Sequence, residues 1–270
     1  MRKIKHLDFW FSLASSASIL FICSTFAATP DAANYALDDS GSWAKPTPAS
    51  GRLLNALKHW PPATLSLDQG RPEFIRGIRT PGNDDLIGMV KYFVVQVPIE
   101  KVVRLNEAFG DYPNIWKDVL SVKIEVQEKN RIVTEWTRKA PAFFLPKVHY
   151  RMVTLIDKSN STRVIYRHQL VDGNLVKTSD ALVIADKISD SKTRISVLNF
   201  FTPEIGPFRS LVSGKIWRQS LENGFKEDIA FRARIEHPEW SIDRVTEEAE
   251  QTLDSFPIKN IEYTDLIHFD

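Results

Sequence analysis

The sequence predicts an α+β domain in which an antiparallel β-sheet is followed by one long C-terminal α-helix. Six segments between residues 119 and 201 are rich in Val, Ile, Thr and aromatic residues, alternate in polarity and are joined by short turns. Residues 208–234 then place apolar side chains at three- and four-residue steps. Consecutive strands joined by short turns pair antiparallel, because parallel strands need long crossover connections.

The individual elements follow from local signals. A first strand is expected at 88–97, where Pro98 ends it, and a helix at 98–109, where Gly110 ends the apolar periodicity. A second short helix is expected at 111–116. After the long helix, residues 241–253 read as a weaker amphipathic helix. The six strands of the meander are expected at 119–128, 131–138, 147–157, 162–172, 175–187 and 193–201.

Composition sets limits on function. The chain has 270 residues, of which 43% are hydrophobic and 26% charged, so it can bury a large core and is not disordered throughout. Lys and Arg number 35 against 34 Asp and Glu, which gives no electrostatic footprint for nucleic acid. Cys23 is the only cysteine, and the histidines are scattered singly. We therefore expect no bound metal. Because the sequence has no dinucleotide-binding or phosphate-binding motif, we also expect no cofactor.

The N-terminus predicts export. A basic head (Arg2, Lys3, Lys5) precedes an uncharged run from Phe9 to Ala28, and small residues stand near Ala27. This order is typical of a signal peptide covering residues 1–27. A retained membrane anchor and lipidation at Cys23 are the alternatives. All three would deliver the folded part outside the cytoplasm, to a bacterial periplasm or the exterior.

Residues 28–86 read as a proline-punctuated extension. One amphipathic helix is expected in it, at Arg52–Trp60, before Pro61 and Pro62. This helix either docks on the main domain or acts as a lid or partner-binding element. The main domain is expected at 87–237, and residues 238–270 form a C-terminal helical extension.

Two stretches resemble a known superfamily. Residues 94–102 (VVQVPIEKV) resemble a strand that runs into a Pro-x-Glu-x-Val helix start, and residues 109–116 (FGDYPNIW) resemble its aromatic segment with Tyr-Pro-x-Trp. With the order of elements, they resemble the START-related, polyketide cyclase-like (SRPBCC) superfamily over about 88–236. The resemblance implies a helix-grip fold, in which a curved antiparallel sheet wraps around the long C-terminal helix. It also implies an apolar cavity between sheet and helix, open at one end.

Strand alternation nominates residues that face this cavity. On the strands we expect one inward face with mostly apolar side chains and a few polar ones, which must pair with each other, with water or with a ligand. An internal hydrogen-bond network and orientation of a ligand's polar head are both open. His168 and Asp180 could form an acid–base pair only within hydrogen-bond reach. The candidate ligand-binding set is Trp136, Tyr150, Met152, Tyr166, His168, Asp180, Asn199, Phe201, Trp217 and Leu221.

The sequence thus predicts an exported START-like protein that binds or carries a hydrophobic small molecule, such as a lipid, isoprenoid or aromatic metabolite, and is not an enzyme. A cyclase- or dehydratase-type enzyme using the same cavity is one alternative. An envelope interaction module with a filled core is another. The apolar loop Phe143–Leu145 could be a lid, a tip that touches the membrane transiently, or a packed corner. Oligomeric state is not predicted.

Overall fold

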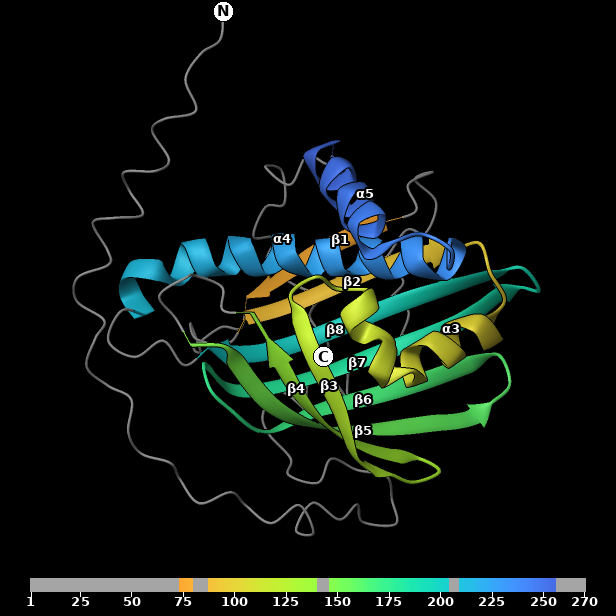
Figure 1. Cartoon of the computed structure of the whole chain (residues 1–270), viewed down its shortest axis with the longest axis horizontal. Helices are drawn as coiled ribbons and strands as arrows, with labels where there is room; N and C mark the ends of the chain where they lie inside the picture. Colours follow the sequence, from red (N-terminus) through yellow and green to blue (C-terminus); the bar gives the residue numbers. More distant parts are fainter. Residues whose placement is uncertain (1–72, 80–86, 140–145, 204–208, 256–270) are drawn as a thin grey trace, which may run out of the picture.

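The computed structural model describes residues 73–79, 87–139, 146–203 and 209–255 (Figure 1). Within them, eight strands form one antiparallel sheet in the order β1-β2-β8-β7-β6-β5-β4-β3. The predicted meander is confirmed, because β3 to β8 pair in succession. The strands are β1 (Glu73–Arg79), β2 (Ile87–Val95), β3 (Val119–Gln127), β4 (Arg131–Arg138), β5 (Val148–Asn160), β6 (Arg163–Gly173), β7 (Val176–Ser189) and β8 (Lys192–Pro203).

Strand β1 was not expected from the sequence. It lies in the stretch interpreted as an extension and pairs with β2 along its whole length, from Glu73 opposite Phe93 to Arg79 opposite Ile87. Its sequence, EFIRGIR, mixes charge with apolar residues and contains a glycine, so its alternation is weak. An edge strand forms a ladder on one side only, and neighbouring β2 supplies that ladder.

The helices confirm the helix-grip architecture. The chain forms α3 (Ile99–Glu107), the 3₁₀ helix η2 (Phe109–Asn114), α4 (Arg209–Glu236) and α5 (Ile242–Ser255). Helix α4 runs across the inner face of the curved sheet, with α3 and η2 on the same side (Figure 1). Helix α5 packs against α4. The sheet does not close, since β1 and β3 are its two edges.

One apolar core joins the inner face of the sheet to the helices. Val95 of β2, Val102 of α3 and Ile229 of α4 are among its fully buried members. Each such side chain contributes about 1.5–3 kcal/mol by leaving water. Of the helices described, none is long and apolar enough to cross a membrane. Among all the described residues, no three His, Cys, Asp or Glu side chains are grouped so that they could hold a metal ion.

Three predicted features lie outside the described residues. They are the signal segment 1–27, the amphipathic helix Arg52–Trp60 and the loop Phe143–Leu145.

Candidate functional site

Strand register shows which candidate residues share the inner face. Residues directly opposite each other on paired strands point to the same side of a sheet. One row joins Thr154, His168, Ala181 and Asn199 across β5, β6, β7 and β8. Trp136 of β4 stands opposite Tyr150 of β5, and Val122 of the edge strand β3 stands opposite Trp136. Six of the predicted residues on the strands therefore share the inner face with Phe201: Trp136, Tyr150, Met152, Tyr166, His168 and Asn199.

The inward assignment of Asp180 is wrong. Asp180 pairs with Gln169 and Phe200, which lie on the outer face. The pairing of β7 with β8 slips by one residue between Val176 and Thr178, so alternation counted from Val176 ends on the wrong face. Asp180 is buried there and accepts a hydrogen bond of 3.0 Å from Gln169. Since the sheet separates it from His168, the two cannot form a direct acid–base pair.

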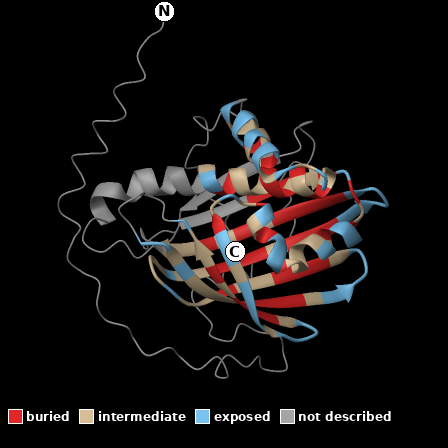
Figure 2. Cartoon of the chain, in the orientation of Figure 1, coloured by how far each residue is buried: buried red, intermediate tan, exposed pale blue. Residues whose placement is uncertain are grey.

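The inner face divides into a packed zone and a half-buried zone. In the packed zone, Phe93, Val164 and Ala185 are buried beneath the helices. Further along the same strands, burial becomes incomplete, as the tan segments at the left ends of the strands show (Figure 2). We call this half-buried set the open zone; it comprises Tyr150, Met152, His168, Leu170, Val183, Val197, Asn199 and Phe201.

Aromatic rings close one side of the open zone. Trp136 stacks on Tyr150 at a centroid distance of 5.8 Å and contacts Tyr112 edge-on at 5.3 Å. The Trp136 indole donates a hydrogen bond of 2.8 Å to Thr134 Oγ1, which satisfies its polar atom. Burial raises the pKa of Tyr150 to about 12, although nearby Arg138 opposes the rise. Tyr150 is therefore a neutral hydrogen-bonding group at physiological pH.

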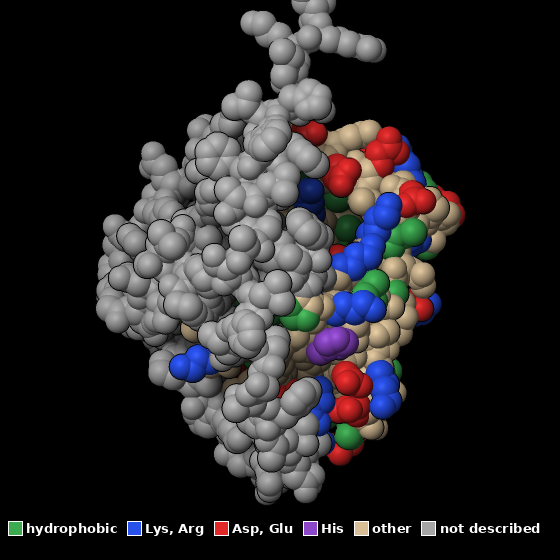
Figure 3. Space-filling model, turned by 60° about the vertical axis from the view of Figure 1, so that its left-hand side comes forward, with side chains coloured by type: hydrophobic (Ala, Val, Ile, Leu, Met, Phe, Trp, Pro, Cys, Tyr) green, Lys and Arg blue, Asp and Glu red, His purple; other side chains and the backbone are tan. Residues whose placement is uncertain are grey.

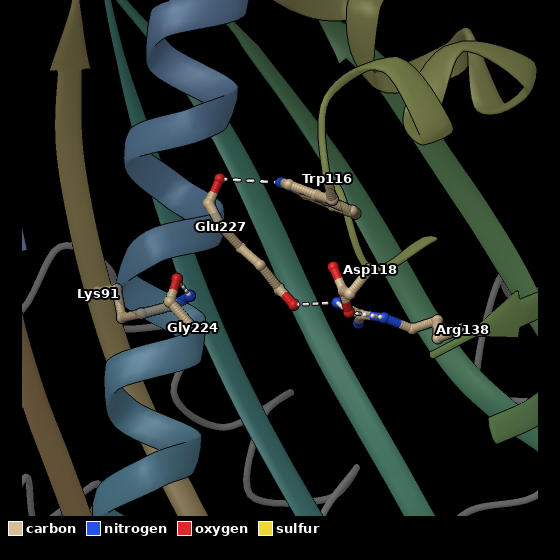
Figure 4. A network of polar contacts seen from close by, with 6 residues as sticks. All are labelled: Lys91, Trp116, Asp118, Arg138, Gly224 and Glu227. Carbon is tan, nitrogen blue, oxygen red and sulfur yellow. Dashed lines mark hydrogen bonds and ion pairs between the residues drawn. The ribbon is translucent and has the colours of Figure 1, made fainter. Parts of the chain in front are cut away.

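A charged cluster ties β4 and the connection between η2 and β3 to α4. The guanidinium of Arg138 contacts Glu227 of α4 and donates a hydrogen bond of 2.7 Å to Asp118 Oδ2 (Figure 4). The Trp116 indole donates to the backbone carbonyl of Glu227 at 3.0 Å. These contacts fix α4 relative to the β3–β4 edge, beside Tyr150.

A second ion pair ties α4 to β2, which lies at the other end of the strand order from β4. Lys91 of β2 is 5% exposed, and its ammonium lies 2.8 Å from Asp228 Oδ2. The same ammonium donates to the Gly224 carbonyl at 2.9 Å (Figure 4). Burial raises the pKa of Asp228 to about 6, with Lys91 opposing and Glu227 assisting the rise. Together the two clusters hold α4 to the inner face by polar contacts with β2 and with β4.

Two more polar groups of the inner face are paired within the protein. His168 Nδ1 lies 2.9 Å from Thr154 Oγ1, and burial lowers the pKa of His168 to about 4. Its imidazole is therefore neutral at pH 7. The Tyr166 hydroxyl donates to Glu107 of α3 at 3.1 Å, and Lys158 also contacts Glu107.

Asn199 differs from these groups. Its side-chain oxygen is buried and has no hydrogen-bond partner among the described residues. Phe201 lies half-buried beside it on β8. The side chains of Trp217 and Leu221 lie outside the described residues, so their place in the site stays a prediction.

Sequence reasoning missed the charged residues that hold α4. Lys91, Arg138 and Asp228 do carry a signal, because each interrupts or ends an apolar pattern on a predicted strand or helix. A charge at such a position has to find a partner across the core. The identity of that partner depends on how α4 crosses the sheet. This crossing cannot be read from the sequence.

Comparison with solved structures gives the fold class. A STAR-related lipid transfer protein fragment from Xanthomonas axonopodis matches with a TM-score of 0.51 at 10% identity, covering 61% of this chain and 94% of that one. Human STARD10 matches with a TM-score of 0.51 at 11% identity, covering 69% of this chain and 79% of that one. An aromatase/cyclase from Streptomyces sp. R1128 matches more loosely, with a TM-score of 0.43 at 14% identity, covering 62% of this chain and 96% of that one.

The chain therefore has the helix-grip fold of these START-related structures. No protein-family model matches the chain, and comparison with curated protein sequences finds no match.

Proposed function

We propose that this chain is an exported binding protein that carries a hydrophobic small molecule between the inner face of its sheet and α4. The open zone carries the proposal. Apolar side chains such as Met152, Leu170 and Phe201 keep part of their surface exposed although they share a face with a fully packed core. Covering that surface gains about 25 cal/mol per Å², so an apolar ligand is the natural occupant.

The polar atoms around the open zone fit a ligand with a small polar group. The buried side-chain oxygen of Asn199 has no donor within the described part of the chain, and an unpartnered buried polar atom costs about 1–3 kcal/mol. A hydroxyl or amide of the ligand would supply the missing hydrogen bond. Tyr150 and neutral His168 lie on the same face and add further hydrogen-bonding groups. A lipid, an isoprenoid and an aromatic metabolite all meet these requirements.

Export rests on the N-terminal sequence. The basic head, the uncharged run and the small residues before Ala28 support cleavage after Ala27. Membrane contact during ligand transfer remains part of the proposal. In Figure 3, basic and acidic side chains intersperse over the described part of the face shown, so no patch of one charge gathers there. Uptake would therefore rely on apolar contact more than on attraction to anionic lipid.

The cyclase- or dehydratase-type alternative loses its acid–base pair, because His168 and Asp180 lie on opposite faces of the sheet. His168 contacts Thr154 instead, and a hydroxyl does not act as a carboxylate would toward an imidazole. The geometry accordingly favours binding.

Native mass spectrometry of protein purified from its own cell envelope tests the proposal. We expect a co-purifying apolar compound that organic extraction releases. An NBD-labelled fatty acid should bind the emptied protein, and Met152→Glu should weaken that binding at least about tenfold by placing a charge in the open zone. Ile188→Glu is the matched control, since Ile188 is 53% exposed. Equal affinities for both variants would contradict the proposal.

A further inference from the structure

The outer face of the sheet is buried as thoroughly as the inner one. Leu182 and Ile184 of β7 and Leu198 of β8 are 0% exposed, and Phe200 is 2% exposed. Leu182 stands opposite Leu198, and Ile184 opposite Ile165. We call Leu182, Ile184, Leu198 and Phe200 the outer patch.

The described elements leave the outer patch uncovered. Helices α3 and α4 and the 3₁₀ helix η2 pack on the inner face, and α5 packs against α4 (Figure 1). The exposed fractions hold for a single chain. Among the described residues, no helix or strand supplies the cover that these apolar side chains need.

The composition of the outer face points to a polypeptide cover. Asp180 and Gln169 are 1% and 6% exposed in the middle of the apolar residues. Asp186, close by, joins Arg163 and Arg194 in ion pairs of 2.5 and 2.8 Å. A surface that mixes buried charge with buried leucine needs a cover with both apolar side chains and hydrogen-bonding groups.

We propose that the segment 28–72 docks on the outer face and places its amphipathic stretch Arg52–Trp60 over the outer patch. Leu53, Ala56, Leu57 and Trp60 recur at helical spacing and form one apolar stripe, while Asn55, Lys58 and His59 fall off it. This stripe matches the apolar surface of the outer patch.

Chain length agrees with this occupant. Twelve residues, 61–72, separate Trp60 from the start of β1 and reach about 40 Å when extended. The path from β1 to β7 crosses β2 and β8, three strand spacings or about 15 Å. The segments 80–86, 140–145 and 204–208 are short connections between elements. The tail 256–270 is the remaining rival, and it starts from α5 on the helix side.

Docking there would make the N-terminal segment a structural part of the domain. It would shield β7 and β8 from a second copy, and it would leave the ligand site on the inner face untouched. The inference is independent of what the inner face binds, so its failure would not affect the proposed function.

Thiol labelling of the full chain tests the inference. In a Cys23→Ser background, Ile184→Cys places a single thiol in the outer patch, and Ile195→Cys places one on the inner face, where Ile195 is 2% exposed. Adding Leu53→Asp and Leu57→Asp should raise the labelling rate at position 184 at least about tenfold and leave position 195 unchanged. An unchanged rate at position 184 would overturn the inference.

A tail variant controls for the rival. Leu266→Asp with Ile267→Asp should leave the labelling rate at position 184 unchanged, and a rise there would assign the cover to the tail. The Leu53→Asp and Leu57→Asp changes could raise the labelling rate at positions 184 and 195 alike. In that case, crosslinking of the protein with its natural sequence tests the inference. Photo-leucine in the natural sequence should join peptides containing Leu182 or Leu198 to the peptide spanning 52–60. Crosslinks only to 256–270, or none to 28–72, would overturn the inference.

Discussion

Replacing Lys91 by methionine should destabilise the protein through Asp228. The two side chains are 6% and 12% exposed, and their charged atoms lie 2.8 Å apart. Methionine matches the volume of the lysine stem but leaves the carboxylate buried without its cation. Breaking a buried ion pair from one side costs about 3–5 kcal/mol. That loss is a large share of the stability of a typical domain.

The loss should depend on pH. The pKa of Asp228 in the folded protein is raised to about 6 from an ordinary value of 3.8. The stabilising effect of this raised pKa is fully present below about pH 4 and disappears as the pH rises through 6. Without Lys91 the pKa rises further, so the variant keeps losing stability at pH values where the natural protein no longer does. The difference in free energy of unfolding between the natural protein and the Lys91→Met variant should therefore grow above pH 6 and shrink toward pH 5.

Urea unfolding at pH 5 and pH 8 measures this difference. Lys117→Met is the matched control, because Lys117 and Asp243 also lie 2.8 Å apart but are 56% and 78% exposed. An exposed pair contributes about 0–1 kcal/mol. The reasoning is refuted if both variants lose the same stability, or if the Lys91→Met deficit is equal at the two pH values.

Three further outcomes follow from the site. Because His168 has its pKa lowered to about 4, it stabilises the fold above pH 6.5 and loses this effect as the pH falls toward 4. In urea titrations, His168→Gln should flatten that acid-side slope by up to about 1.4 kcal/mol per pH unit; an unchanged slope would count against a buried imidazole. Gly173→Ala should lower the thermal midpoint, since its Cβ would lie 2.7 Å from Tyr150 Cβ; an unshifted midpoint speaks against this close approach. Asn199→Ala should weaken binding of an NBD-labelled fatty acid while Asp180→Asn does not, and the reverse order would contradict the face assignment.

The sequence predicted most elements because their signals are local. Pro98 and Gly110 bracket the helix that became α3, and the apolar steps of 208–234 became α4. The break expected between the strands at 162–172 and 175–187 is present, although it falls at Asn174 and Leu175, between β6 and β7. Strand β1 was missed because its alternation is weak and because its stability comes from pairing with β2.

The face of β7 could not be predicted for a different reason. Residues Ala181 to Ala185 are all apolar, and all of them except the half-buried Val183 are buried. A continuous apolar run carries no alternation, and the slip near Val176 then reverses any count that starts there. The ion pairs of Lys91 and Arg138 were beyond reach because they depend on how α4 crosses the sheet.

Xenon binding tests most directly whether an apolar hollow lies between the open zone and α4. Xenon enters dry apolar cavities and is seen readily in crystals under gas pressure. After organic extraction of any bound compound, we predict xenon beside Met152 and Phe201 on the inner face. Crystals with no xenon beneath α4, and side chains of the protein itself filling that space, would contradict a ligand-carrying role.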